Sequence, residues 1–331
     1  NSFYNYIYMK PKNCLIFGAS GQIGRNLIRK LTKNNYKVTA VTRNFHQKAY
    51  LLKTQGNPGY IDFVESSIFD ENNLRELVKS SDICINLIGI LFEKGKTDTF
   101  KNIHEIFPSF LANLCQEYNV KQFIHISSLG IEKAIDSKYA QSKLKGEKFI
   151  REKFNNYIIL KPSVVYSVDD NFTTNFMTLL SILPFFPLYY SGQTKFRPIY
   201  CSDLTEIIYQ TISQNLKSIT IECIGPEEIT LKKILQKLLK LIDKKRLLLP
   251  LPLIFAKIIC FFTELFPKPL ITSDQLKLLK HDNIPSGKYK TNFDLNIPSY
   301  ANFDLEVQKY SQMWREAGQF SQVENKDNNY K

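Results

Sequence analysis

Short apolar runs alternate with amphipathic segments over the first half of the chain. Six of these runs have the length and composition of strands, at residues 13–17, 37–42, 60–65, 82–88, 121–127 and 157–165. Between them, apolar residues at helical spacing predict helices at residues 22–33, 72–79, 98–118 and 138–154. Apolar strands that alternate with helices form a parallel sheet covered on both faces. The pattern therefore predicts an α/β fold with a doubly wound parallel sheet of the Rossmann type.

The regular alternation stops near Val168, and the signals beyond it are sparser. They predict a strand at 219–224, a helix at 231–242, and a helix at 273–280 that opens with a capping-box sequence. We therefore expect a smaller C-terminal α/β domain. The predicted organisation is an N-terminal extension (1–12), a Rossmann domain (13–167), the smaller domain (168–317), with a return to the Rossmann domain near 196–215 left open, and a disordered tail (318–331).

Two apolar, proline-interrupted stretches stand out in the second half, at residues 176–190 and 247–262. The second has 16 residues, with Pro250, Pro252 and Lys257 among them, whereas a membrane-spanning helix needs about 20 apolar residues. We expect it to be a buried helix of the smaller domain. The alternative is an apolar face that docks on a partner or in the lipid interface.

Composition and charge narrow the class of protein. The 331 residues are 44% hydrophobic and 23% charged, as in ordinary globular proteins. The net charge of +13 comes mostly from lysines dispersed along the chain, which argues against nucleic-acid binding and is compatible with attraction to an anionic membrane surface. Six cysteines without CxxC spacing and four scattered histidines predict buried thiols, a reducing compartment and no metal site. Residues 1–12 do not resemble a signal peptide, and Met9 is a possible natural start, so whether residues 1–8 are native stays open.

The strand at 13–17 runs directly into a glycine-rich turn, Gly18-Ala-Ser-Gly-Gln-Ile-Gly24, that opens a helix. In this arrangement the first glycine permits the tight turn, the second lets the backbone approach a pyrophosphate, and the third allows close helix–sheet packing. The helix N-terminus then offers N–H groups to the phosphates. The turn predicts a dinucleotide-binding site.

The end of the second predicted strand indicates which dinucleotide binds. NAD sites place an acidic residue there to bond the ribose 2′-hydroxyl, whereas an arginine accommodates the 2′-phosphate of NADP. This chain has Arg43 and no acid at that point. We therefore predict a preference for NADPH, with a solvated arginine at a strand end as the alternative.

A Tyr-x-x-x-Lys pair, Tyr139 and Lys143, opens the predicted helix at 138–154. A lysine on the same helix face can lower the pKa of a phenol, which makes the tyrosine a usable acid or base. The chain holds four such pairs, but only this one follows a strand that ends in Ser127-Ser128. Ser128 could hydrogen-bond a substrate oxygen or merely cap the strand. The three candidate catalytic residues are Ser128, Tyr139 and Lys143.

Together these residues resemble the short-chain dehydrogenase/reductase superfamily. More narrowly, the chain is similar to its atypical branch, related to NAD-dependent epimerases and dehydratases, that contains the NADPH-binding accessory subunit of respiratory complex I. The segments that carry this resemblance lie at residues 86–89, 142–147, 160–172, 196–203, 225–230 and 271–283. Two departures are Ser66-Ser67, where relatives usually have Gly-Asp, and Lys161 in place of a usual arginine.

The resemblance implies a set of nucleotide contacts. The cofactor-binding candidates are Gly18, Ser20, Gly21, Gln22, Ile23, Gly24, Arg43, Ser67, Ile68, Leu87, Ile88, Gly89, Tyr139, Lys143, Pro162, Val164 and Val165. No metal is expected. Lys143 would bond the nicotinamide ribose even in a purely structural site, so retention of the catalytic residues does not decide whether turnover occurs.

The resemblance also implies a role. We expect an NAD(P)H-binding, non-catalytic accessory or assembly subunit of complex I, with complex I subunits as partners. The alternative is an active NAD(P)-dependent reductase or sugar-nucleotide epimerase/dehydratase. We expect a peripheral location on the cytoplasmic face of a bacterial inner membrane, or on the matrix side in a mitochondrion. The sequence leaves the substrate and the oligomeric state open.

Overall fold

The computed structural model describes residues 11–43, 59–266, 269 and 271–315. Residues 1–10 of the predicted extension and the whole predicted tail lie outside this range. The chain divides into two compact units. Unit 1 comprises residues 1–127, 142–161 and 205–221, and unit 2 comprises residues 128–141, 162–204 and 222–331. The domain boundaries given above stay a prediction, and each unit is described by itself.

Unit 1 is built on a parallel sheet. Its strands are β1 (Asn13–Phe17), β2 (Lys37–Thr42), β3 (Ile61–Glu65), β4 (Ile83–Asn86), β5 (Gln122–Ile126), β6 (Tyr157–Pro162) and β11 (Ile219–Cys223). The order is β3-β2-β1-β4-β5-β6-β11, extended by β14 (Lys290–Thr291) of unit 2 beside the end of β11. Each adjacent pair from β3 to β6 is parallel. This confirms the predicted doubly wound Rossmann sheet.

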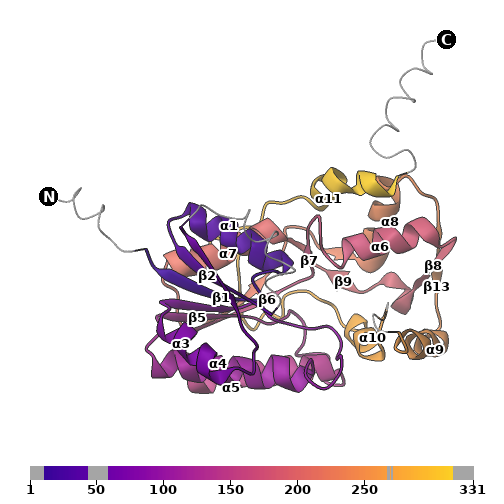
Figure 1. Ribbon diagram of the computed structural model, residues 1–331. Coiled ribbons are helices and arrows are strands. Elements are labelled where there is room, and N and C mark those ends of the chain that lie inside the picture. Colours follow the sequence, from indigo (N-terminus) through magenta and orange to yellow (C-terminus); the bar gives the residue numbers. More distant parts are fainter. Residues whose placement is uncertain (1–10, 44–58, 267–268, 270, 316–331) are drawn as a thin grey trace, which may run out of the picture. The chain divides into compact units, whose positions relative to one another are not determined.

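Helices cover both faces of the sheet. They are α1 (Gln22–Lys33), α3 (Glu71–Lys79), the π-helix η2 (Lys101–Ile106), α4 (Phe107–Glu117), α5 (Lys138–Lys153) and α7 (Cys201–Ser213). Figure 1 shows α1 and α7 on one face, with α3, α4 and α5 on the other. The apolar core of unit 1 includes Phe17, Leu74, Leu111, Phe123 and Ile159, all less than 3% exposed. The sheet residues that face the helices are thus removed from water, which is the main stabilising contribution.

Three of the predicted elements have a boundary that differs from the structure by more than one residue. The strand predicted at 82–88 ends at Asn86, whose side-chain oxygen accepts a hydrogen bond from the N–H of Ile88 and so turns the chain. The strand predicted at 157–165 ends at Pro162, which has no N–H to donate. The helix predicted at 98–118 begins with the π-helix because Pro108 cannot donate the usual bond to the carbonyl of His104.

Unit 2 combines short strands with helices. The strands are β7 (Val165–Tyr166), β8 (Phe185–Leu188), β9 (Lys195–Phe196), β10 (Ile199–Tyr200), β12 (Ile229–Thr230), β13 (Leu247–Pro250) and β14. The helices are α6 (Thr173–Ile182), η3 (Tyr189–Gly192), α8 (Leu231–Leu241), α9 (Leu253–Thr263), α10 (Ser273–Leu279), α11 (Phe303–Ser311) and η4 (Gln312–Trp314). The predicted capping box opens α10, where Thr272 and Gln275 bond each other's backbone N–H. The unit's core packs α6 and α8 around Tyr166.

The apolar stretch at 247–262 contradicts its prediction as a buried helix. Residues 247–250 form β13, and only Ala256 and Cys260 of α9 are buried. The remaining large apolar side chains of α9 are mostly exposed. Among the described residues, no helix is both long and apolar enough to span a bilayer. The six cysteines are all buried free thiols.

Candidate functional site

The glycine turn joins β1 to α1 in unit 1. Gly18 has φ +80°, a left-handed conformation that favours glycine, and its carbonyl accepts from the N–H of Gly21 at 3.0 Å. Helix α1 begins at Gln22 with Gly21 as its N-cap residue, and no side chain caps it. An uncapped helix start directs unpaired backbone N–H groups and the positive end of the helix dipole outward. This is an arrangement that suits an anion.

The three glycines of the turn are required for different reasons. A Cβ on Gly24 would lie 2.5 Å from the carbonyl oxygens of Gly18 and Ala19, so only glycine lets α1 pack against the turn. A Cβ on Gly21 would have only one contact, 3.3 Å from the Gly18 oxygen, so this glycine is not needed for packing. A Cβ on Gly18 would press on the backbone of Leu87 and Ile88, at 3.2–3.3 Å. The turn is therefore seated directly against the loop that follows β4.

Two buried polar side chains hold this loop, residues 87–90, in place. The Asn86 oxygen accepts from the N–H of Ile88 at 3.1 Å, so its amide group faces Nδ1 of His125 at 3.2 Å. Nε2 of His104 accepts from the N–H of Ile90 at 3.2 Å, and its Nδ1 lies 2.9 Å from Oγ of Ser142. These contacts position Leu87, Ile88 and Gly89, three of the predicted cofactor-binding residues.

The same contacts fix both histidines in neutral forms. His104 accepts at Nε2, which leaves the proton on Nδ1, and His125 accepts from Asn86 at Nδ1, which leaves the proton on Nε2. Burial, together with the charge of Lys143 and the neighbouring His125, lowers the pKa of His104 from 6.5 to about 2. Burial, with Lys143 and Lys161, also lowers the pKa of His125 well below its usual value.

Lys143 lies beside this loop. Its side chain is 3% exposed, its Nζ donates to the carbonyl of Ile126 at 3.0 Å, and a Cβ on Gly89 would be 3.3 Å from that nitrogen. Burial lowers the pKa of Lys143 from 10.5 to about 8; the nearby Lys161 acts in the same direction and Glu147 opposes it. The structure thus brings the glycine turn, the loop after β4 and Lys143 together at the carboxyl ends of β1 and β4.

A buried ion pair lies along the same helix as Lys143. Glu147, 1% exposed, accepts from Oγ of Ser127 and from Nζ of Lys161, each at 2.5 Å, and Arg151 donates to its other oxygen at 3.0 Å. Lys161 is completely buried. Helix α5 also approaches η2 closely, because a Cβ on Gly146 would fall 1.9 Å from the His104 oxygen. These contacts hold α5, and with it Lys143, against the sheet.

The remaining candidates of unit 1 lie at the ends of β2 and β3. Arg43 follows β2 and donates to the carboxylate of Asp98 at 2.8 Å. Ser67 follows β3 and accepts from the N–H of Phe69 at 3.2 Å, while Ile68 packs against the apolar core. Ser20, Gln22 and Ile23 lie in the glycine turn and the first turn of α1.

Five candidates belong to unit 2. They are Ser128, Tyr139, Pro162, Val164 and Val165. The Tyr139 backbone N–H donates to Asp274 at 2.9 Å, so a residue of α10 caps the start of α5. The pKa of Tyr139 is raised, because burial outweighs a hydrogen bond with Ser128. The expected lowering of this phenol's pKa is therefore wrong.

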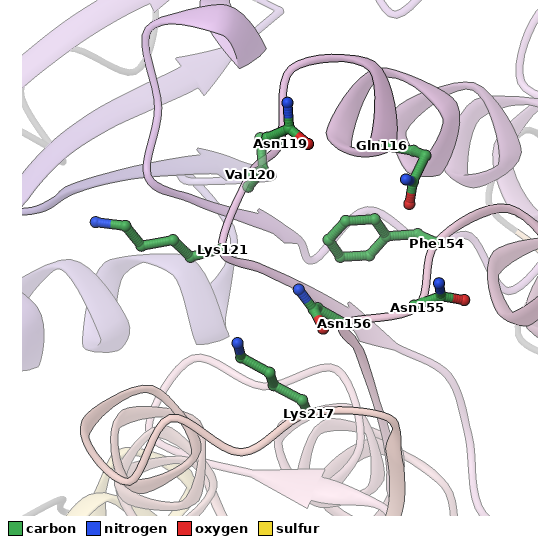
Figure 2. Close-up of a pocket in the computed structure, with 8 residues that line it drawn as sticks. All are labelled: Gln116, Asn119, Val120, Lys121, Phe154, Asn155, Asn156 and Lys217. Carbon is green, nitrogen blue, oxygen red and sulfur yellow. The ribbon is translucent and has the colours of Figure 1, made fainter.

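A separate polar pocket of about 320 Å³ lies elsewhere in unit 1. Figure 2 shows it lined by Lys121, Asn156 and Lys217 among others. Lys121 and Asn156 directly precede β5 and β6, so this pocket lies at the amino ends of the strands. Ligands of doubly wound sheets bind beyond the carboxyl ends. We therefore place the candidate site at the glycine turn and not at this pocket.

The comparison with known proteins agrees with this geometry. Residues 18–180 match the model of a family described as NAD(P)H-binding. Over these residues the chain belongs to this NAD(P)H-binding family. The match begins at the first glycine of the turn and includes Lys143 and the buried ion pair around Glu147.

Two of the relatives are named as subunits of mitochondrial NADH-ubiquinone oxidoreductase or NADH dehydrogenase. The chain is 26% identical over 284 residues to the mitochondrial 40 kDa subunit of NADH-ubiquinone oxidoreductase from Neurospora crassa, covering 85% of this chain and 74% of that protein. It is 28% identical to the mitochondrial subunit 9 of the NADH dehydrogenase [ubiquinone] 1 alpha subcomplex from Mus musculus, covering 79% and 70%.

Solved structures with the same fold include epimerases. A UDP-N-acetylglucosamine 4-epimerase from Bacillus cereus superposes with a TM-score of 0.64 at 15% identity, covering 92% of this chain and all of that one. An epimerase from Methanothermobacter thermautotrophicus gives 0.67 at 14% identity, covering 97% and 95%. At this identity the likeness shows the fold.

Sequence reasoning missed the residues that support the site. Asn86 and His125 are polar residues within otherwise apolar predicted strands, and that interruption was the available signal. His104 lies in a predicted helix and carries no local signal. Lys161 could be recognised as a charge within an apolar predicted strand, and Glu147 as a carboxylate one turn after Lys143 on the same predicted helix, but nothing local pairs them.

Proposed function

We propose that this chain is an NADP(H)-binding accessory or assembly subunit of respiratory NADH:ubiquinone oxidoreductase (complex I), with NADPH as a structural ligand. The observation that carries the nucleotide part is the uncapped start of α1 behind a turn in which Gly21 leaves room for a phosphate. The assembly part is supported by relatives that are named as subunits of this oxidoreductase and align with most of the chain.

Different residues of unit 1 would bind different parts of the nucleotide. Backbone N–H groups of the turn from Gly18 to Gly24 would bind the pyrophosphate, Arg43 the 2′-phosphate, and Lys143 the nicotinamide ribose. The loop from Leu87 to Gly89 would line the site between them. When bound, NADPH supplies a hydride donor, which a structural role leaves unused. The remaining cofactor candidates named from the sequence stay predictions.

The identity of the nucleotide tests the proposal. Protein purified from its native cell and then denatured is expected to release NADPH or NADP⁺, identified by mass. Gly21→Val should purify without nucleotide, because its side chain would occupy the place of the pyrophosphate. A ligand that binds only the folded state adds about 2.7 kcal/mol at a hundredfold excess over Kd, so added NADPH should raise the melting temperature of the wild type and leave Gly21→Val unchanged.

Gly24→Val is the matched control for this experiment. Its Cβ would lie 2.5 Å from two backbone oxygens, so it should lower stability even without nucleotide, whereas Gly21→Val should unfold close to the nucleotide-free wild type. A wild-type melting temperature that does not respond to NADPH would refute the structural-ligand role.

Cofactor preference is expected to depend on Arg43 and its partner Asp98. Arg43→Asp should shift the preference toward NADH, because it removes a charge-assisted phosphate contact and adds an acceptor for a hydroxyl. Asp98→Asn should strengthen NADPH binding by about threefold to tenfold and leave NADH unchanged, because Arg43 no longer has to exchange a carboxylate for the phosphate. Calorimetric Kd values for both nucleotides give the ratio.

The exposed pair Arg75–Glu117 provides the control for that ratio. Glu117→Gln also frees an arginine of unit 1 from its carboxylate, but at α3 and α4, away from the ends of β1 and β2. It should leave both Kd values unchanged. Equal affinity of the wild type for NADH and NADPH would contradict the role given to Arg43.

The second candidate is an active NAD(P)-dependent reductase or epimerase. The hydrogen bond between Ser128 and Tyr139 favours it, since a serine and a tyrosine that share a bond can also share a substrate oxygen. The raised pKa of Tyr139 favours the structural role. Turnover of cofactor with a carbonyl or sugar-nucleotide substrate, lost in Tyr139→Phe, would decide for the enzyme.

The proposed function implies a peripheral location at the inner membrane. Complex I subunits would hold the protein on the matrix side in a mitochondrion, or on the cytoplasmic face in a bacterium. The lysines are dispersed, so we expect a high-salt wash to leave the protein on native membranes and detergent to release it. A wholly soluble native protein would favour the reductase.

A further inference from the structure

Helix α9 presents an unusual surface. Six of its eleven residues are large apolar side chains with 45–66% of their surface exposed: Leu253, Ile254, Phe255, Ile258, Phe261 and Phe262. Leu265 and Phe266, just beyond the helix, are exposed by 70% and 67%. Single exposed apolar residues are common on globular proteins, but a contiguous group of this size marks a surface that something else covers.

These six side chains share one broad side of the helix. With about 100° of rotation per residue, they occupy an arc of about 200° that starts at Leu253 and ends at Phe255. Ala256 and Cys260 occupy the opposite side, where they pack with Tyr189 and Leu276. Figure 1 shows α9 beside α10, the helix that carries Leu276. The arc is therefore convex, apolar and wider than half of the helix.

The strand that leads into α9 adds further exposed apolar side chains. Leu247 of β13 is paired with Phe185 of β8, and they are exposed by 67% and 54%. Leu249, two residues on and so on the same face of the strand, is 46% exposed. Exposed apolar side chains therefore occur in α9, in β13 and in β8 of unit 2.

One lysine of α9 lies within the apolar arc, where it can meet an anionic surface. Lys257 falls near one edge of the arc, between Leu253 and Phe261, and forms no ion pair within the described part of the chain. A lysine in this place can lie along the apolar face and raise its ammonium group to lipid phosphates. The single acid of the segment, Glu264, instead accepts from the backbone N–H of Ser273 at the start of α10.

We propose that the exposed face of α9 lies in the boundary between headgroups and acyl chains of an anionic bilayer, with the helix parallel to the membrane plane. Eleven residues are about 16 Å long, half the thickness of the hydrocarbon core, so the helix cannot span. A protein partner would need a groove that encloses more than half of the helix, whereas lipid covers a convex arc of any shape. An apolar helix face that carries phenylalanine and leucine side chains can bury itself about 5–10 Å into this boundary.

This inference goes beyond the proposed function and does not depend on the nucleotide. Lipid contact would add to the contacts with complex I subunits. It predicts that the isolated full chain binds lipid vesicles with no other protein present.

Vesicle flotation with the full-length chain tests it. Vesicles of equal parts phosphatidylcholine and phosphatidylglycerol are expected to carry the wild type upward, and the double variant Ile254→Ser, Phe261→Ser should bind at least about tenfold more weakly. The matched control is Leu305→Ser, Met313→Ser, which replaces two apolar residues of unit 2 with similar exposure, 61% and 69%. It should bind within about twofold of the wild type.

A substitution of Lys257 and a measurement at high salt distinguish insertion of apolar side chains from attraction between charges. Lys257→Gln should weaken binding to the anionic vesicles a few-fold and leave binding to pure phosphatidylcholine unchanged. High salt should leave most of the wild type bound, because apolar insertion is not screened. Full release by salt would overturn the proposal, as would equal flotation of the wild type and the Ile254/Phe261 variant.

Other occupants of the arc would give different results. A second copy of the chain would show as a dimer that the same double variant dissolves, without vesicle binding. A protein partner would bind the chain in detergent extracts of respiratory membranes, again without vesicle binding. Either result overturns the lipid assignment. The nucleotide content of every sample is measured in parallel and should be equal, so loss of NADPH would challenge the proposed function alone.

Discussion

Glu147→Ala is expected to lower the free energy of unfolding by about 3–5 kcal/mol. Its carboxylate is 1% exposed and accepts from Ser127, Lys161 and Arg151. Removing it leaves the Lys161 ammonium, which is completely buried, without its carboxylate in a medium of low dielectric. Urea unfolding followed by circular dichroism measures the loss.

The paired substitution shows whether the ion pair itself stabilises the fold. Glu147→Leu combined with Lys161→Met removes both charges and keeps the volume, and it should recover most of the stability that Glu147→Ala loses, because replacing a buried pair by apolar residues is often neutral. The exposed pair Arg75–Glu117 is the surface control, and Glu117→Ala should cost less than about 1 kcal/mol. A cost below about 1 kcal/mol for Glu147→Ala would show that water reaches this pair.

The ion pair also acts on the candidate site. Glu147 raises the pKa of Lys143 and Lys161 lowers it, while burial lowers it most. Removal of Glu147 should therefore push the pKa of Lys143 below about 8, and a neutral amine would no longer bind a nucleotide ribose as a charged donor. A structural defect alone would not move this titration.

The elements of the first half were predictable because their signals are local. The strand at 13–17 and the helix at 22–33 have the bounds of β1 and α1, since apolar spacing and a glycine turn mark both ends. The turn also allowed a nucleotide site to be predicted, because its three glycines lie within seven residues and the close contact of Gly24 is with its own neighbours Gly18 and Ala19.

The predictions that failed concern features that depend on contacts between residues far apart in the sequence. A helix that faces a core and a helix that faces a membrane have the same apolar pattern, so the sequence of 247–262 does not distinguish them. The sequence analysis favoured a buried helix, whereas the structure exposes α9. Tyr139 was expected to have a pKa lowered by its helix neighbour Lys143, but burial of the phenol raises this pKa. Asp274 caps the start of α5 from 135 residues away from Tyr139, which no local spacing reveals.

Mild acid is expected to destabilise unit 1 through two buried histidines. In the folded chain, burial is the main reason why the pKa of His104 is lowered to about 2 and that of His125 is lowered well below 6.5. Unfolded histidine titrates near 6.5, so below that pH the unfolded state binds more protons than the folded state. The contribution of the two neutral histidines to the free energy of unfolding is therefore fully present above about pH 6.5. It is lost as the pH falls toward the folded pKa values, by about 1.4 kcal/mol per pH unit for each histidine.

Urea unfolding between about pH 6.5 and 4.5 should therefore show a loss of about 2 kcal/mol from His104, and His125 should add to the loss in the same direction. The double variant His104→Gln, His125→Gln should flatten this slope, although it starts from lower stability. His281→Gln, which replaces a partly exposed histidine of unit 2, should keep the wild-type slope. A flat wild-type profile, or an unchanged slope in the double variant, would mean that these histidines are not neutral in the fold.

Nucleotide should be released together with this acid unfolding, because the pKa of His104 is about 2 in the fold and the proton is taken up as the unit opens. A proton on Nε2 of His104 removes its ability to accept from the N–H of Ile90, and a proton on Nδ1 of His125 sets two donors, its own N–H and the Asn86 amide, against each other. Both events loosen the loop of residues 87–90, against which Gly18 and Lys143 rest. Bound NADPH favours the folded, neutral state, so excess NADPH should move the acid transition to lower pH in the wild type and leave it unmoved in Gly21→Val.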